Sequence, residues 1–191
     1  NHPIGEWDVS NVVRLNQAFA QSAFNQPIGK WDVSNVQDMT GMFHHARAFN
    51  QPIGKWDVSN VISMERLFAS TVFDQDISDW NTRSVETMSH MLTGVSLTCD
   101  IGGWNVSNVM DMSYLFRNAA FNRDISGWDV SNVQNMGGMF SDSTFNRDIS
   151  EWDVSSVVLM FEMFSGELTT FNHNLSEWDV SGVVNMAGMF K

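Results

Sequence analysis

Cysteine, proline and tyrosine are scarce in this chain of 191 residues, which has one cysteine, three prolines and one tyrosine. With Cys99 as the single cysteine, no disulfide can form within the chain and no cluster of thiolates can bind a metal. The sequence shows no nucleophile motif around this residue, so we expect a small, partly buried and unreactive thiol.

Basic residues and long apolar runs are also few. Ten lysines and arginines stand against 22 aspartates and glutamates, which gives a formal net charge of -12. Such a chain repels phosphate backbones and anionic lipid surfaces, so nucleic acid is not an expected partner. The longest purely apolar run, 157–161, is far shorter than the roughly 20 residues that cross a bilayer. We therefore predict no direct membrane insertion.

Common catalytic and metal-binding motifs are absent as well. The sequence contains no H-E-x-x-H, no phosphate-binding P-loop and no G-x-S-x-G. Serine recurs throughout the chain in a repeating pattern, whereas catalytic groups are singular. The adjacent His44 and His45 would point about 100° apart on a helix, which prevents them from sharing one metal. We predict no enzyme activity, no cofactor and no metal site.

What the chain does have is tryptophan at nearly constant spacing. The intervals between the eight tryptophans are 24, 25, 24, 24, 24, 24 and 26 residues. The tryptophans are Trp7, Trp31, Trp56, Trp80, Trp104, Trp128, Trp152 and Trp178. A fixed period in this range is typical of repeat arrays. We predict a single continuous array over residues 1–191, cut within a repeat at both ends and thus a segment of a longer chain.

The apolar residues keep fixed positions in each repeat, counted here from its tryptophan. Ile or Leu stands at -3, Val mostly at +2, Val at +5, Met or Leu at +8, and Phe or Leu at +12 and -7. The alternation around tryptophan is the period of a half-buried strand, and the later spacings of three and four are those of a short helix. We predict that tryptophan and these recurring apolar residues face inward and form the core. We predict an α/β solenoid of about eight leucine-rich-repeat-like units, each with one short parallel strand and one short helix in 24–26 residues.

The stretch 28–36 resembles the leucine-rich-repeat signature, with tryptophan in place of one leucine. The stretch 145–157, Phe-Asn-Arg-Asp-Ile-Ser-Glu-Trp-Asp-Val-Ser-Ser-Val, is more closely similar to the BspA-like repeats of bacterial surface proteins. This resemblance covers the whole chain and implies a cell-surface or secreted array that mediates adhesion. It supplies no catalytic residue.

The most regular polar feature is an acidic row at position +1. Its members are Asp8, Asp32, Asp57, Asp129, Asp153 and Asp179, with Asn81 and Asn105 interrupting the row. On a strand these side chains would line the concave face of the array, about 4.8 Å apart. They would then form a stripe that binds cations or a basic partner. Alternatively, each aspartate accepts hydrogen bonds from backbone amides of its own turn.

Variable exposed positions are where a repeat array recognises a partner. Beside the acidic row, we predict that the binding face includes four basic residues, Lys30, Lys55, Arg123 and Arg147. The asparagines at position -6 are instead expected to form a structural ladder between repeats. We expect a non-catalytic scaffold that recognises a protein or a surface glycan. The alternative is a structural subunit that docks within a larger assembly.

Overall fold

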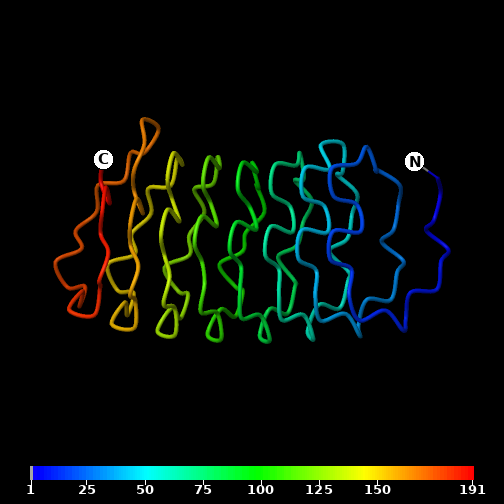
Figure 1. Cartoon of the computed structure of the whole chain (residues 1–191), viewed down its shortest axis with the longest axis horizontal. Coiled ribbons are helices and arrows are strands. Elements are labelled where there is room, and N and C mark those ends of the chain that lie inside the picture. The colour runs from blue at the N-terminus through cyan, green and yellow to red at the C-terminus, as the bar shows by residue number, and fades with distance from the viewer. Residues whose placement is uncertain (1) are drawn as a thin grey trace.

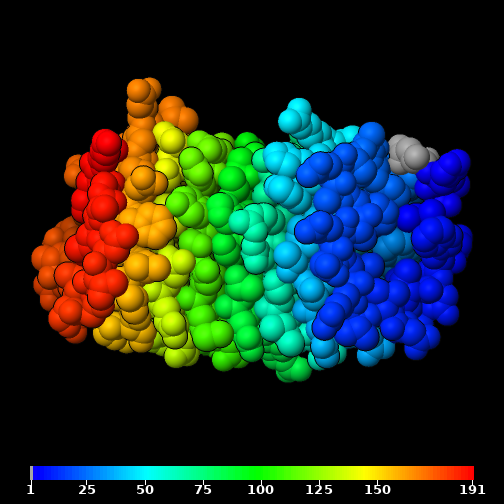
Figure 2. Space-filling view, viewed as in Figure 1, coloured from blue at the N-terminus to red at the C-terminus, as the bar shows by residue number. Residues whose placement is uncertain are grey.

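The computed structural model describes residues 2–191, which form an elongated stack of coils. The chain passes from one end of the long axis to the other, and each sequence repeat forms one coil beside the preceding one (Figure 1). We number the coils 1 to 8 in the order of their tryptophans, from Trp7 to Trp178, and each coil ends at the -7 residue that precedes the next tryptophan. The space-filling view shows one continuous elongated body (Figure 2).

No helix and no extended strand occurs within residues 2–191. Regular pairing between coils consists of isolated parallel bridges, one residue per coil, at position +7. The bridged residues are Arg14, Asp38, Ser63, Thr87, Asp111, Asn135, Leu159 and Asn185. The predicted α/β leucine-rich-repeat-like solenoid, with a strand and a helix in every unit, is therefore wrong.

The segment from +8 to +14 is not a helix because its backbone amides bond to the next coil. In coil 4, the N–H groups of Met88 and His90 donate to carbonyls of coil 5 at 3.0 and 2.8 Å, and those of Leu92 and Gly94 do so at 3.1 and 2.7 Å. His90 and Gly94 have φ of 57° and 69°. A right-handed helix needs negative φ at every residue, so these positions interrupt it.

Short turns in the same segment explain why the sequence looked helical. The N–H groups of Met91, Thr93 and Val95 donate to the carbonyls three residues earlier, at 3.0, 3.1 and 3.1 Å. These successive turns bring positions +8, +11 and +12 to the inside. The spacings of three and four are therefore real, although they arise from turns.

The tryptophan segment is a turn as well, and not the predicted strand. The backbone N–H of Trp104 donates to the carbonyl of Ile101 at 3.1 Å, and its indole Nε1–H donates to the carbonyl of Ile77 in the preceding coil at 3.1 Å. The same indole bond, 3.0–3.3 Å long, joins every neighbouring pair of coils. From Trp31 to Trp178 the tryptophans are buried in the core, as predicted, and they also tie successive coils together.

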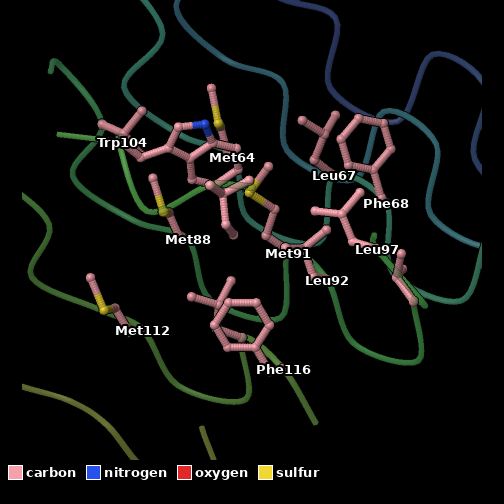
Figure 3. Close-up of a cluster of buried hydrophobic side chains, with 14 of the residues drawn as sticks. Met64, Leu67, Phe68, Met88, Met91, Leu92, Leu97, Trp104, Met112 and Phe116 are labelled. Carbon is pink, nitrogen blue, oxygen red and sulfur yellow. The ribbon is translucent and has the colours of Figure 1, made fainter. Parts of the chain in front are cut away.

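The interior is a continuous apolar core along the stack. Phenylalanines at +12 and -7 form two columns, as in Phe68 and Phe73, whose rings stack 4.0 Å apart. Leu92 and Leu97 replace both phenylalanines in coil 4 and remain within the cluster beside Phe68 and Phe116 (Figure 3). The predicted core positions are confirmed here, since these four side chains are at most 2% exposed.

The interval after Trp152 is the longest between tryptophans, with 26 residues, and it includes the protruding loop coloured orange in Figures 1 and 2. Leu168 in this loop is 61% exposed. The bridge from Leu159 to Asn185 still joins coils 7 and 8. The insertion therefore extends outward without interrupting the stack.

Candidate functional site

The aspartates at +1 are exposed, and each accepts a hydrogen bond from the backbone N–H of the serine two residues later. In coil 2, Asp32 Oδ1 accepts the Ser34 backbone N–H at 3.1 Å and the Ser34 hydroxyl at 2.6 Å. Asp8, Asp129 and Asp153 form the same pair of bonds. The turn interpretation of this row is thus confirmed, whereas binding through the row stays a prediction.

These hydrogen bonds hold the carboxylates in their charged form. The Ser34 hydroxyl and amide lower the pKa of Asp32, against a small opposing effect of the neighbouring Asp8 charge. The pKa values of Asp8, Asp57, Asp153 and Asp179 are lowered by the same kind of serine contact. Asn105 shows that charge is not required by the turn, because its Oδ1 accepts the Ser107 amide at 3.0 Å and the hydroxyl at 2.7 Å.

We predict that the array loses stability in acid through this row. A carboxylate whose pKa is lowered on folding stabilises the fold above its unfolded pKa, near 3.8, and this contribution disappears as the pH falls through the folded pKa. The urea concentration at the midpoint of unfolding should be constant between about pH 7 and 5, and it should decrease at pH values under about 4. Replacing Asp32, Asp57 and Asp153 by Asn should preserve the turns and make the fall shallower. An unchanged acid profile of this variant would refute the role of these aspartates.

The four basic residues of the predicted binding face lie outside the acidic row. Lys30 pairs with Glu6 of the preceding coil at 2.9 Å, and both side chains are largely exposed. Lys55 lines a hollow with Asp76 and Asp79. These contacts place both lysines along the edge formed by positions -5 to -1, next to acidic groups.

Arg123 and Arg147 follow the same edge toward the C-terminal coils. Arg123 is exposed. Arg147 Nε donates to the carbonyl of Asn122 at 2.9 Å and lines a hollow with Asp124 and Asp148. The structure therefore does not bring the acidic row and the basic residues into one site.

The asparagines at -6 form the predicted structural ladder. The backbone N–H groups of Asn50, Asp74, Asn146 and Asn172 donate to the side-chain oxygen of the residue one coil earlier, at 3.0–3.3 Å. In coil 5, the amide of Thr98 donates in the same way to Asp74 at 2.7 Å. The side chains at -6 are therefore engaged in hydrogen bonds between coils.

The helix assumed for the histidine pair is wrong, because residues 44 and 45 lie in turns. The rings of His44 and His45 lie 4.2 Å apart. Burial, His45 and Arg66 lower the pKa of His44. Cys99 is half-buried, as expected, and burial raises the pKa of its thiol. Within the part of the chain that the structure describes, no three His, Cys, Asp or Glu side chains are grouped so that they could hold a metal ion.

A groove with a volume of about 830 Å³ lies on the side of the stack next to the bridges. Five of its lining residues are at position +6, namely Gln37, Ile62, Glu86, Met110 and Gln134. Four more are at position +4, namely Asn60, Ser84, Asn108 and Asn132. The groove thus follows the array across coils 2 to 6. We call it the amide groove.

Position +6 of the amide groove was missed by the sequence analysis. Its backbone belongs to the inter-coil ladder, as when the Ile62 N–H donates to the Gln37 carbonyl at 2.8 Å, and its side chains are exposed. Ile62 and Met110 are 40% and 43% exposed. The available signal was an alternation of apolar and polar residues at +6 from coil to coil, visible only when the repeats are aligned.

Arg83 and Asn105 complete the amide groove where the acidic row is interrupted. Arg83 replaces the serine at +3, and its backbone N–H donates to Asn81 at 3.4 Å. Its guanidinium forms no ion pair with any residue in 2–191, although its charge lowers the pKa of Asp57. The middle of this acidic protein therefore presents an exposed, unpaired positive charge.

Comparison with known proteins identifies one family. The model of a family described as "Mycoplasma protein of unknown function, DUF285" matches residues 1–99 and again 95–191. The two matches together cover the whole chain. No curated protein and no solved structure is significantly similar to the chain. Residues 2–191 contain no helix long and apolar enough to cross a membrane.

Proposed function

The chain belongs to the family of Mycoplasma proteins of unknown function, DUF285, and we propose that it is a non-catalytic recognition module at a cell surface. The resemblance of its repeats to BspA-like surface proteins supports a cell-surface or secreted location and a role in adhesion. Its partner in this proposal is a protein or a surface glycan.

The amide groove is the observation that carries this proposal. Residues that recur in most coils face inward or join neighbouring coils, as the tryptophans from Trp31 onward and the -6 asparagines do. The groove instead gathers residues that differ between coils, among them Ile62, Arg83 and Met110. In repeat arrays, variable side chains on a rigid scaffold are those that select a partner.

The proposal is tested by binding of the labelled array to intact cells and to immobilised extracellular proteins and glycans. A groove variant carrying Ile62→Asn, Arg83→Gln and Met110→Asn should bind at least tenfold more weakly than the unmodified array. A matched control carrying Val13→Asn and Val158→Asn changes the same +6 row outside the groove, where these valines are 45% and 39% exposed.

The control should bind like the unmodified array, and circular dichroism should show that both variants keep the fold. If the groove variant binds as tightly as the unmodified array, the amide groove takes no part in recognition. Absence of binding to every surface tested would overturn the adhesive role itself.

A further inference from the structure

We propose that the amide groove binds an extended polypeptide in the polyproline II conformation, with its apolar side chains three residues apart and one acidic side chain between them. This inference rests on the proposed recognition function and defines the class of its ligand. The occupant is a segment of a partner protein that lies along the axis of the array.

The spacing of the exposed apolar side chains is the first argument. Ile62 and Met110 stand two coils apart at +6, with Glu86 between them. Paired parallel segments lie about 4.8 Å apart, so two coils span about 9.6 Å. One turn of polyproline II contains three residues and rises about 9.3 Å. A chain in this conformation therefore presents every third side chain to successive apolar side chains of the groove.

The amide side chains are the second argument. Polyproline II has no internal hydrogen bonds, so its backbone groups need outside partners. The Nδ2 groups of Asn60, Asn108 and Asn132 donate to carbonyls of the preceding coil at 2.7–2.8 Å. These bonds fix the side chains in place. The amide oxygens are then available to accept backbone N–H groups of the ligand, while Gln37 and Gln134 can donate to its carbonyls.

Arg83 is the third argument, because it defines the charge of the ligand. It belongs to coil 4, between the coils of Ile62 and Met110. Asn81 and Asn105 keep the position +1 row uncharged beside it, so a ligand carboxylate meets no aspartate of that row in coils 4 and 5, and Glu86 at position +6 is the one acidic residue that lines the groove. An arginine without an ion-pair partner binds carboxylates through paired N–H donors.

A polypeptide fits these features better than a glycan does. No aromatic side chain lines the amide groove, and its apolar contacts are aliphatic. Aliphatic contacts at intervals of about 9.6 Å suit isolated side chains of a peptide. Methionine in particular adapts its shape to different apolar side chains.

The test uses three fluorescent peptides with a proline background, measured by anisotropy with the 191-residue array. The first peptide has leucine at every third position and one glutamate between the first two leucines. The second has glutamine in place of that glutamate. The third has the composition of the first with leucine at every second position. We expect the first peptide to bind about tenfold more tightly than either of the others.

Array variants assign the binding to the groove. Arg83→Gln should bind the first two peptides alike, and Ile62→Asn with Met110→Asn should reduce binding of the first by tenfold or more. The Val13→Asn and Val158→Asn control should bind like the unmodified array.

Equal binding of the first and third peptides, or undiminished glutamate preference in Arg83→Gln, would overturn the proposal. If cells bind through the groove while no peptide does, or while a glycan does, the ligand class is wrong and the recognition function stands. If the peptides bind and cells do not, the assignment of the groove stands and the adhesive role falls.

Discussion

Replacing Trp104 by Ala should lower the free energy of unfolding by about 3–5 kcal/mol, the usual effect of removing a buried aromatic side chain. Trp104 is 3% exposed and stacks on Trp80 with ring centroids 6.5 Å apart. The substitution leaves a cavity in the middle of the stack. It also removes the only indole donor of coil 5 to the Ile77 carbonyl in coil 4.

Trp104→Phe separates these two effects. The phenyl ring keeps much of the packing, but the buried carbonyl of Ile77 loses the indole donor and keeps only the Trp80 backbone N–H, at a cost of about 0.5–1.5 kcal/mol. Trp7→Ala is the matched control, because Trp7 is 64% exposed and its loss should change stability by about 0.5 kcal/mol or less. Urea unfolding followed by circular dichroism measures all three variants. A Trp104→Phe midpoint equal to that of the unmodified array would show that the indole bond contributes nothing.

The sequence was sufficient to divide each coil into inner and outer residues. Ile101, Val106, Val109 and Met112 are all at most 1% exposed, as their positions predicted. Burial depends on which side chains are apolar and recur, and that information is local. The same residues could not distinguish a helix from a series of turns, because both place spacings of three and four on one side.

The missing information was the sign of φ at positions +10 and +14. Most coils have a residue other than glycine there, such as His90 or Tyr114, with φ of 57° and 56°. The cost of this conformation, about 1–2 kcal/mol per residue, is offset by bonds between coils that no single repeat reveals. The signal that could have been used is glycine, which appears with positive φ at these two positions in five places: Gly41, Gly94, Gly138, Gly166 and Gly188.

The two parts of the candidate site also differ in how far the sequence predicted them. The acidic row was found in the sequence because it repeats, and repetition reflects its role in the turns. The amide groove was not found, because Ile62, Arg83 and Met110 differ from the residues at the same positions in neighbouring coils. Their assembly into one groove depends on the order of the coils in space, which only the structure gives.

Removal of a phenylalanine from the stacked columns is the second change with a large expected effect. Phe116 is fully buried, stacks on Phe121 at 4.2 Å and lies 5.7 Å from Phe140. Phe116→Ala should cost about 3–5 kcal/mol in unfolding free energy, measured by urea titration. The loss combines the apolar area removed from the core with the cavity that the neighbouring coils cannot close.

Coil 4 shows how the same space can be filled without phenylalanine. Its Leu92 and Leu97 replace both aromatic rings, and Val95 stands where coil 5 has the smaller Ala119. All three are at most 2% exposed, so the added methyl groups of the valine compensate for part of the lost ring volume. We therefore expect the coil 4 arrangement to be transferable to coil 5.

The triple variant Phe116→Leu, Ala119→Val and Phe121→Leu should cost only about 1–2 kcal/mol, chiefly from the lost stacking of these two rings on each other and on the rings of coil 6. Phe116→Leu with Phe121→Leu, but with Ala119 retained, should be less stable than the triple variant because the cavity is not filled. If adding Ala119→Val destabilises that double variant, the valine of coil 4 does not compensate for its leucines. In that case each coil has its own requirement for core volume, and the residues of coil 4 cannot replace those of coil 5.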